Sequence, residues 1–432
     1  MLGYYLTLAL RSFRRNKILT ALMVLAIAVG IGTSMTALTV FRVLSDDPIP
    51  SKSARLFHVQ LDPQPAIDYS PGDEPMNLLN RFDAEALLRD RHAPRQTMTT
   101  GSLVTVQPDS GAIKPFRIGG RNATADFFAM FEAPFAYGHG WSANDDQAHA
   151  QVVVIGKALN QRLFGGGNSV GKSLRLNGNG FRVVGVLDDW APSPRFFDLS
   201  AGKFSSDEQV YLPFATALEL KFQHNGSVSC YGPASDNFGL NSPCGWIQYW
   251  VELNNPAQAP AFKAYLDNYS ARQHDAGRYQ RPPNTRLRNV MDWLRVQNVV
   301  PDDVRLQLWF AFGLLLVCLL NTVGLLLAKF LRRSSEIGVR LALGANRGAI
   351  FRQCLVEAAS IGIAGGIVGL ALTLFGLWLV RQRPTEYAQL AQLDGAMLLL
   401  TLLLAIVASL LAGLLPAWRA TRIAPAIQLK TQ

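Results

Sequence analysis

Four long runs of uncharged, mostly apolar residues constrain the fold of this chain more than any other feature. They cover residues 18–41, 306–328, 358–380 and 395–418. As an α-helix, each run is long enough to cross a hydrocarbon core about 30 Å thick. The first run is too long for the apolar core of a signal peptide and continues into Arg42 without a small-residue cleavage site, so we expect a retained helix. The pattern predicts an α-helical membrane protein with four transmembrane helices.

The overall composition requires a second, water-facing part. The 432 residues are 49% hydrophobic and 17% charged, which is too apolar for one soluble domain and too polar for a chain wholly inside a membrane. Between the first and second runs, β-like segments alternate with helical ones: strands at 56–61, 103–107, 151–155, 181–187, 209–212 and 249–253, and helices at 84–91, 157–164 and 259–271. We therefore expect a large extracytoplasmic α+β domain inserted between transmembrane helices 1 and 2.

These patterns divide the chain into three parts. Residues 1–45 are expected to form an N-terminal amphipathic helix on the membrane surface and transmembrane helix 1. Residues 46–304 are expected to form the inserted domain. Residues 305–432 hold transmembrane helices 2–4.

The formal net charge of +10 comes from three basic clusters beside the apolar runs. The clusters are Arg11, Arg14, Arg15 and Lys17; Lys329, Arg332, Arg333, Arg340, Arg347 and Arg352; and Arg419, Arg422 and Lys430. Basic residues beside membrane helices favour the cytoplasmic side. We therefore expect both termini in the cytoplasm and the inserted domain outside. The charge is interpreted as a topology signal, with no nucleic acid as a partner.

The segment between the second and third runs predicts a short helix at about residues 334–345. Glu336 lies in its first turn, and Glu336 and Arg340 stand four residues apart in the favourable order. Gly344 is suited to end this helix, and Asn346 is suited to cap the next one. A helix too short to span, held between two spans, is either a handle for a soluble partner or an interfacial helix without one.

The sequence SEIGVRLALGANRGAIFRQCLVEA, at residues 335–358, resembles the cytoplasmic signature of MacB/FtsX/LolC-type ABC transporter permeases, also called type VII transporters or mechanotransmitters. In that family this loop is the coupling helix that docks on an ATPase subunit. The resemblance implies that seven residues here couple to such a partner: Glu336, Ile337, Gly338, Arg340, Leu341, Leu343 and Gly344.

The resemblance extends over nearly the whole chain, most clearly at residues 6–33 and from residue 314 onward, where LLPAWRATRIAPAIQLK is similar to the family's ending. Residues of about 121–194 resemble the "sabre" subdomain of a MacB-like periplasmic core domain, and the flanking parts resemble its "porter" subdomain. The family implies a multi-pass protein of the bacterial inner membrane, in contact with lipid, with a second permease chain in a homo- or heterodimer. Some members also bind a periplasmic adaptor and an outer-membrane channel.

No LSGGQ-type signature of ABC ATPases occurs in the sequence, and it starts directly at the membrane helix, whereas MacB carries its ATPase on the same chain. We therefore expect a stand-alone permease subunit that is not itself an enzyme and binds no cofactor, with ATP and Mg on the partner ATPase. The resemblance implies mechanotransmission, in which ATP hydrolysis drives a periplasmic conformational change, with export or efflux as the expected function. The alternatives are an FtsX-like scaffold that regulates a cell-wall enzyme and a LolC/LolE-like lipoprotein-releasing subunit.

One segment formally matches a phosphate-binding loop, GGNSVGKS at residues 166–173. Such a loop must follow a strand and open a helix, so that backbone N–H groups at the helix end hold phosphate. Here a helix-like segment precedes it and a hairpin-like segment follows. We interpret it as a turn into a hairpin.

The cysteines and histidines predict a disulfide rather than a metal site. Cys230 and Cys244 lie in a Gly/Ser/Asn/Pro-rich part of the external domain, where an oxidising compartment would pair them. Metal binding by this pair with His224 is the alternative, but the six histidines show no close ligand spacing. Cys318 and Cys354, in or beside the spans, are expected to be small apolar residues.

Two features lie within the spans. Gly362, Gly365, Gly366 and Gly369 recur at three- and four-residue spacing in the third run, which predicts close helix packing. Asn321 is a strongly polar residue in the second run. We expect it either to form an interhelical hydrogen bond or to act as a gate or substrate contact.

Overall fold

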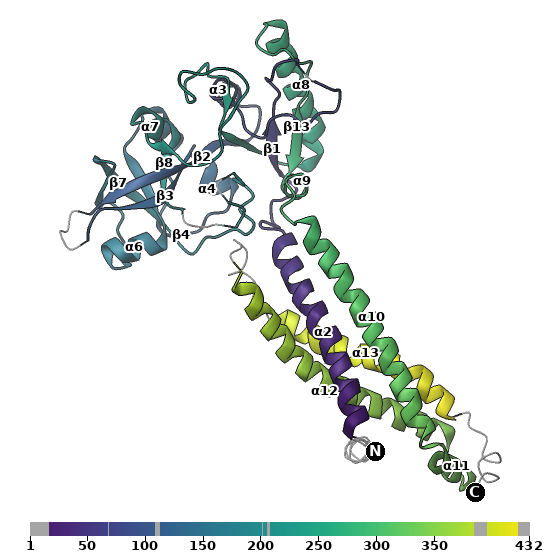
Figure 1. Ribbon diagram of the computed structural model, residues 1–432. Helices are drawn as coiled ribbons and strands as arrows, with labels where there is room; N and C mark the ends of the chain where they lie inside the picture. The colour runs from purple at the N-terminus through teal and green to yellow at the C-terminus, as the bar shows by residue number, and fades with distance from the viewer. Residues whose placement is uncertain are drawn as a thin grey trace. The chain divides into compact units, whose positions relative to one another are not determined.

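The computed structural model describes residues 17–67, 69–108, 113–200, 202–204, 208–383 and 395–421. The expected N-terminal amphipathic helix, most of the link between the third and fourth runs, and the C-terminal tail lie outside these ranges. The chain forms two compact units (Figure 1): a helical unit, residues 1–45 and 300–432, and an inserted domain, residues 46–299.

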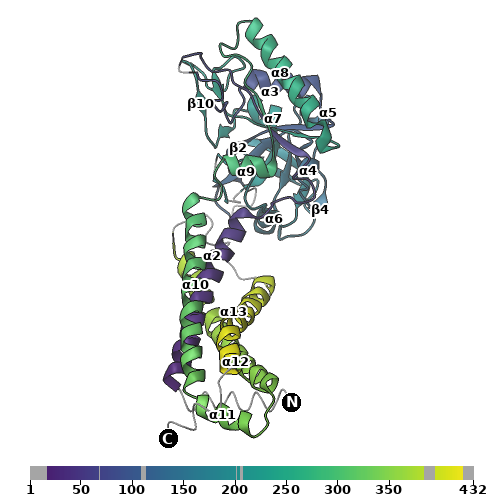
Figure 2. The ribbon, with the colours of Figure 1, turned by 90° about the vertical axis from the view of Figure 1, so that its right-hand side faces the viewer.

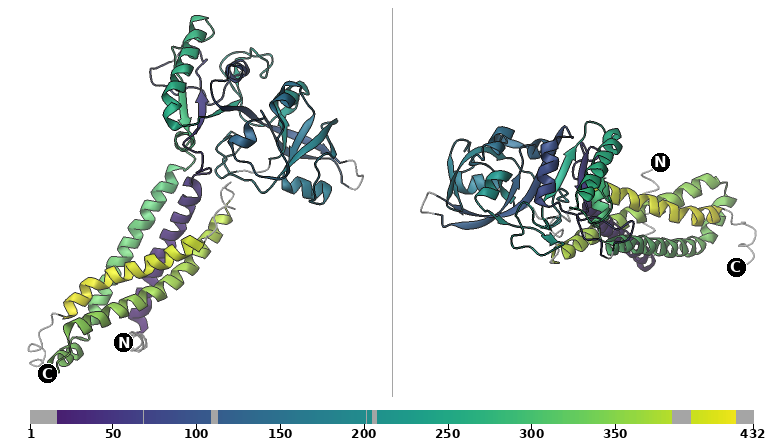
Figure 3. Two further views of the ribbon diagram at one scale, coloured as in Figure 1. Left: turned by 180° about the vertical axis from the view of Figure 1, so that it is seen from behind. Right: turned by 90° about the horizontal axis from the view of Figure 1, so that it is seen from above.

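Four helices of the helical unit are long and apolar enough to cross a membrane: α2 (Lys17–Ser45), α10 (Asp302–Leu331), α12 (Arg347–Arg381) and α13 (Gly395–Thr421). The four predicted runs lie within them. A shorter helix, α11 (Ser334–Ala342), joins α10 to α12. Both α2 and α13 pack against α10 and α12, and Figures 2 and 3 show α12 and α13 side by side.

Each spanning helix buries one stripe of side chains. In α10 the buried residues recur every three or four positions for most of its length: Val304, Ala311, Leu315, Cys318, Thr322 and Leu326. This spacing places them on one helix face. They meet a matching stripe of α2 in one apolar core. The outer face of α10 exposes large apolar side chains such as Trp309 and Phe310, as expected for a helix in lipid.

The inserted domain is built on one large mixed sheet, drawn in Figures 1 and 3. Its main path runs β13-β1-β12-β2-β3-β8-β5-β7-β4, and β6 and β9 pair beside it. The bounds are β1 (Leu56–Gln60), β2 (Arg95–Gln107), β3 (Phe116–Ala123), β4 (Phe135–Gly138), β5 (Val152–Ile155), β6 (Ser173–Leu176), β7 (Asn179–Leu187), β8 (Glu208–Pro213), β9 (Gln223–His224), β12 (Gln248–Glu252) and β13 (Arg286–Asn289). A separate pair is formed by β10 (Ser229–Cys230) and β11 (Cys244–Gly245).

Helices pack around this sheet: α3 (Arg81–Asp90), α4 (Phe127–Met130), α5 (Ala143–Gln147), α6 (Lys157–Phe164), α7 (Phe214–Glu219), α8 (Ala259–Asp275) and α9 (Val290–Val296), with a 3-10 turn at Pro256–Gln258. The predicted strands and helices fall on observed ones, so the prediction of an α+β domain between the first two spans is confirmed. The porter-like and sabre-like division at about 121–194 stays a prediction.

A buried arginine ties two parallel strands of the sheet together. The Arg121 Nη2 of β3 lies 2.8 Å from Asp198 Oδ2, and its Nε lies 2.6 Å from Glu208 Oε2 of β8. Burial alone would raise the pKa of Asp198, but the guanidinium groups of Arg121 and Arg195 hold that pKa below its usual value. The ionised carboxylate therefore stays paired inside the domain.

Candidate functional site

The helix α11, between the second and third spans, ends as the sequence predicts. Gly344 has a φ of +91°, which residues with a Cβ rarely adopt. Its N–H donates to the Leu341 carbonyl at 3.1 Å, and the following N–H donates to the Arg340 carbonyl at 3.0 Å. These two bonds form a Schellman motif. Asn346 then caps α12, since its side-chain oxygen accepts from the Gly348 N–H at 2.9 Å.

One face of α11 packs on the helical unit and the other is exposed. Ile337 and Leu341 are half-buried against the apolar core of the unit, and Gly338 is buried. Leu343 is 83% exposed and Val339 is 53% exposed. Of the apolar residues expected to couple to a partner, only Leu343 is therefore open to one in this chain. Val339 adds to that exposed face, although the sequence analysis does not single it out.

Glu336 fixes α11 through two arginines. Its Oε1 accepts from Arg340 Nη2 at 2.6 Å, and its Oε2 lies 3.8 Å from Arg333 Nε. Arg340 also donates to Gln353 of α12 at 3.4 Å. The predicted pair of Glu336 and Arg340 is therefore present, and it also ties α11 to the third span.

A second carboxylate, Glu357 of α12, joins three spanning helices. Its Oε1 lies 2.7 Å from Lys329 Nζ of α10, and its Oε2 lies 3.3 Å from Arg333 Nη1. The Lys329 Nζ also donates to Thr20 Oγ1 of α2 at 3.5 Å. Because Arg333 contacts both Glu336 and Glu357, the ion pairs run without a break from α11 to α10 and α12, and the hydrogen bond to Thr20 extends this network to α2.

Glu357 is not among the predicted coupling residues, because it lies outside the basic segment 329–352 and just before the third run. The sequence nevertheless contains a signal that Glu357 forms an ion pair. Glu357 is the only acidic residue of α12, and the other charged residues of this helix are arginines. An acid at the edge of a membrane helix generally needs a cationic partner. The sequence does not say which of the nearby cations that partner is.

The small residues of α12 make two close helix contacts. Gly362 and Gly366 face α13, whereas Gly365 and Gly369 face α2. A Cβ added at Gly366 would lie only 2.7 Å from the Cβ of Ala405. The α12 backbone is thus held closely on two sides, as expected for small-residue packing in membranes.

Asn321 does not form the interhelical hydrogen bond that was one of its two expected roles. It lies on the exposed face of α10, and its side chain bonds to no described residue of this chain. Any protein partner for its amide therefore lies outside the described residues of this chain.

The phosphate-loop-like segment is a turn into a hairpin, as interpreted from the sequence. It follows α6 and leads into β6, which pairs antiparallel with β7. The Lys172 Nζ lies 4.9 Å from the centre of the Phe164 ring, a cation–π contact. Because a strand follows, the segment opens no helix on which phosphate could bind.

Cys230 and Cys244 form a disulfide that joins β10 to β11. The metal alternative therefore does not apply to these two thiols. The His224 Nδ1 instead lies 3.0 Å from Thr100 Oγ1. Cys318 and Cys354 are buried free thiols of the helical unit.

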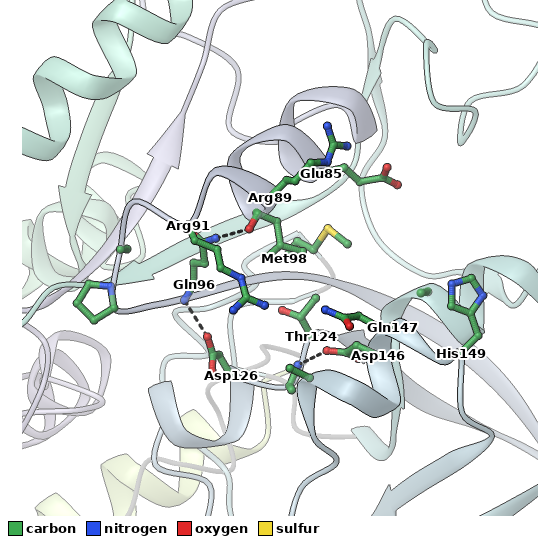
Figure 4. A pocket seen from close by; sticks show the side chains of 16 residues that line it. Glu85, Arg89, Arg91, Gln96, Met98, Thr124, Asp126, Asp146, Gln147 and His149 are labelled. Carbon is green, nitrogen blue, oxygen red and sulfur yellow. Dashed lines mark hydrogen bonds between the residues drawn. The ribbon is translucent and has the colours of Figure 1, made fainter.

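The inserted domain also has a polar groove of about 710 Å³ beside the end of α3 and the start of β2, shown in Figure 4. Its Asp126 carboxylate accepts from the Gln96 N–H at 3.2 Å, and Asp146 accepts from the Ala125 N–H at 2.7 Å. Burial raises the pKa of Asp146 to about 7, although the Ala125 N–H and the Trp141 indole oppose this. Since each carboxylate is held by N–H donors, the pair suits a structural role better than acid–base chemistry.

Family models match two parts of the chain. Residues 20–269 match the MacB-like periplasmic core domain, and residues 308–425 match the FtsX-like permease C-terminal region. The first match begins in α2 and covers most of the inserted domain. The second covers α10 to α13.

Individual relatives are distant. The pyoverdine export ATP-binding/permease protein PvdT of Pseudomonas aeruginosa is 24% identical over 368 residues, covering 84% of this chain and 50% of PvdT. The macrolide export ATP-binding/permease protein MacB of Azoarcus sp. is 23% identical over 431 residues, covering 98% of this chain and 59% of MacB. The crystal structure of the periplasmic region of MacB from Actinobacillus actinomycetemcomitans is 15% identical, with a TM-score of 0.38, and covers 60% of this chain and 98% of that one. This chain spans about half the length of the curated relatives it matches.

Four spanning helices, a large domain inserted after the first, and a short helix between the second and third define a multi-pass permease of the inner membrane. The chain belongs to the MacB/FtsX-type family of ABC transporter permeases.

Proposed function

We propose that this chain couples ATP hydrolysis by an ABC ATPase to a conformational change in its inserted domain, and that the result is export. The observation that carries the proposal is the ion-pair cluster of Glu336, Arg333, Glu357 and Lys329, which ties α11 to the spanning helices α10 and α12. A helix held in this way moves with the spans and cannot slide over them independently. The exposed Leu343 and Val339 offer an ATPase the apolar contacts.

Several finer assignments belong to this proposal. In this proposal the ATPase binds α11 on the cytoplasmic side, both termini lie on that side because basic clusters favour it, and the inserted domain lies in the periplasm. The 432 residues contain no LSGGQ-type signature, and in this proposal they act as the permease while ATP with Mg is bound by the ABC ATPase that contacts α11. The relatives are named for export of pyoverdine and of macrolides, which supports a small molecule as cargo. A periplasmic adaptor and an outer-membrane channel as recipients are part of the proposal.

We also propose a second permease chain against the outer face of α10. Asn321 lies on that face, and an unpaired polar side chain facing lipid is costly. Gly313 and Gly324 of the same helix have nothing within 4 Å of an added Cβ, which leaves space for a close helix contact. Crosslinking between two copies of an Asn321→Cys chain in membranes tests this proposal, and a dimer contact elsewhere would leave the thiols uncrosslinked.

The coupling role is tested by ATPase activity of the permease with its ATPase in lipid nanodiscs. Leu343→Asp should weaken assembly by about 30-fold or more, since loss of a buried anchor costs ~2 kcal/mol or more. Leu240→Asp, an exposed position of the inserted domain, and Lys172→Ala should leave ATP turnover unchanged. Normal assembly and turnover with Leu343→Asp would contradict the proposed docking helix.

The orientation has a separate test. A cysteine at the exposed position Asn225 should react with a membrane-impermeant thiol reagent added to intact spheroplasts, and one at Ala345 should not. Reaction at position 345 would reverse the proposed topology.

A further inference from the structure

The inserted domain holds a second cavity, of about 820 Å³, that differs in kind from the polar groove of Figure 4. Five aromatic rings line it: Phe214, Phe222, His224, Phe238 and Trp246. The rings come from α7 and the residues after it, from β9, and from the residues inside and just after the disulfide-bonded loop 230–244. We call this cavity the aromatic pocket.

The rings stand in a fixed arrangement around Trp246. Phe214 stacks on Trp246 with ring centres 5.7 Å apart and an interplanar angle of 19°. Phe238 meets Trp246 edge-on at 5.2 Å, and His224 does so at 5.7 Å. Aromatic walls at these angles offer both stacking and edge contacts, which favour a flat aromatic guest.

The His224 imidazole lines the pocket in its neutral form. The Thr100 hydroxyl donates its one proton to the Trp246 carbonyl at 3.2 Å, so it accepts at 3.0 Å from the Nδ1–H of His224. Burial lowers the pKa of His224, although nearby backbone groups and Asp198 oppose this shift. The ring therefore keeps one tautomer and one orientation at neutral pH.

Three buried polar atoms that line the pocket have no hydrogen-bond partner among the described residues, and one of them is the His224 Nε2. The Trp246 indole N–H and the Asn122 Oδ1 make no hydrogen bond, and these residues are only 3% and 7% exposed. Buried polar atoms are nearly always paired, so an unpaired donor and acceptor beside one cavity indicate a missing polar guest.

The rim of the pocket adds a cation. Lys221 is exposed and forms no ion pair with a described residue, whereas the other cation, Arg81, is paired with Glu85 at 2.6 Å. The acid on the lining, Asp236, accepts from the Phe238 N–H at 2.9 Å within the loop. Asp236 keeps its negative charge, so the rim is not positive overall, and Lys221 is the lining cation that no described carboxylate pairs with.

We propose that the aromatic pocket binds a small, planar aromatic molecule that carries an anionic group. The ring lies among Trp246, Phe214 and Phe238, and the anion faces Lys221. This binding does not depend on ATP or on the proposed coupling role, so it is measured on the permease alone.

The test is calorimetric titration of the full chain in nanodiscs with naphthalene-2-carboxylate, and with the neutral naphthalene-2-carboxamide as its matched probe. Empty nanodiscs give the lipid blank. We expect saturable binding of the carboxylate at one site. Phe238→Ala should weaken both probes by about two- to tenfold through loss of an aromatic contact, and Leu240→Ala on the same loop should weaken neither. Lys221→Asn should weaken only the carboxylate, by about two- to fivefold.

Asn is chosen at position 221 because Lys221 has a φ of +52°, which Asn adopts readily. Lys114→Asn, at another exposed lysine, is the matched charge control and should change nothing. Thermal unfolding of each variant checks that it is folded. Absence of saturable binding above the lipid blank overturns the proposal, and so does a Phe238→Ala effect no larger than that of Leu240→Ala. Equal binding of the two probes overturns the anionic part.

Discussion

The Lys329 ammonium of α10 lies 2.7 Å from a carboxylate oxygen of Glu357 on α12, and the two side chains are 0% and 4% exposed. Taking two charges out of water is costly, so such a pair is kept only where each partner compensates the other. Arg333 extends the pair to α11 through Glu336. The helix proposed to bind the ATPase is therefore attached to the spans by charge inside the helical unit.

Glu357→Gln should destabilise the helical unit by about 3–5 kcal/mol, because it leaves the buried Lys329 without that carboxylate. The control is Glu336→Gln, whose carboxylate is 40% exposed and should cost less than about 1 kcal/mol. Thermal unfolding in detergent, followed by reaction of the buried Cys318 and Cys354 thiols with a dye, measures both. Equal unfolding temperatures for the two variants would show that the buried pair is not the main attachment.

A double replacement separates stability from coupling. Changing both Lys329 and Glu357 to Met removes both charges together, and such apolar replacements are often neutral or stabilising. We expect near-normal unfolding of this variant but poor stimulation of the ATPase. Full stimulation would mean that the spans follow α11 without the ion pair.

Gly344→Val should loosen the end of α11, whereas Gly344→Asn should not. Nothing lies within 4 Å of an added Cβ at Gly344, so the cost comes from its φ of +91° and not from crowding. A branched residue in this region costs about 1–2 kcal/mol, and Asn visits it more readily. Hydrogen exchange of peptides covering residues 334–345 measures the change. Equal protection in the two variants would contradict the expectation that the positive φ at residue 344 disfavours a branched side chain.

The local sequence pattern predicts where helices such as α11 and α12 begin and end better than it predicts which residues they contact. The end of α11 at Gly344 and the cap at Asn346 depend on backbone conformation and neighbouring residues, so the sequence shows them directly. The direction in which Ile337 faces depends on how α11 packs on α10 and α12, which no local pattern contains. The Glu357 pair is missed for the same reason, since Lys329 is 28 residues away in the chain.

Charged residues that are buried by contacts between distant segments also cannot be recognised as buried from the sequence. Arg121 lies 77 residues before Asp198 and 87 before Glu208, and a sequence reading would ordinarily place all three on the surface. The sheet brings β3 next to β8, and the three groups then satisfy one another inside the domain. The five rings of the aromatic pocket are assembled by the same folding from separate segments.

Gly366→Ala and Gly324→Ala should change stability in opposite directions. A helical Gly→Ala change normally stabilises by about 0.5–1 kcal/mol, which we expect at Gly324 of the monomeric chain in detergent, where an added Cβ meets nothing within 4 Å. At Gly366 the new Cβ would lie 2.7 Å from the Ala405 Cβ, so α12 and α13 must separate. Overpacking costs about 1–3 kcal/mol. The same thiol-dye unfolding assay compares the two, and a stabilised Gly366→Ala chain would contradict the close contact.

His58 should make the inserted domain less stable in acid. Its ring is stacked on Trp293 with centres 3.8 Å apart, and neither ring nitrogen has a hydrogen-bond partner among the described residues. Burial lowers the pKa of His58 from 6.5 to about 3, with Arg288 adding to the shift and Asp198 opposing it. Between these two values the unfolded chain binds a proton that the folded chain does not. Stability therefore falls as the pH drops below about 6.5.

The matched variant is His58→Phe, which keeps an aromatic ring against Trp293 and cannot titrate. The difference in unfolding free energy between wild type and variant cancels all other titrations, including the opposite one of Asp146, whose raised pKa makes stability fall as pH rises toward 7. Measured by denaturant unfolding of the full chain in detergent, that difference should be constant above pH 7. Below about pH 6 it should shift against the wild type by up to about 1.4 kcal/mol for each pH unit. Parallel curves from pH 5 to pH 8 would mean that His58 gains its proton in the folded domain as easily as in the unfolded chain.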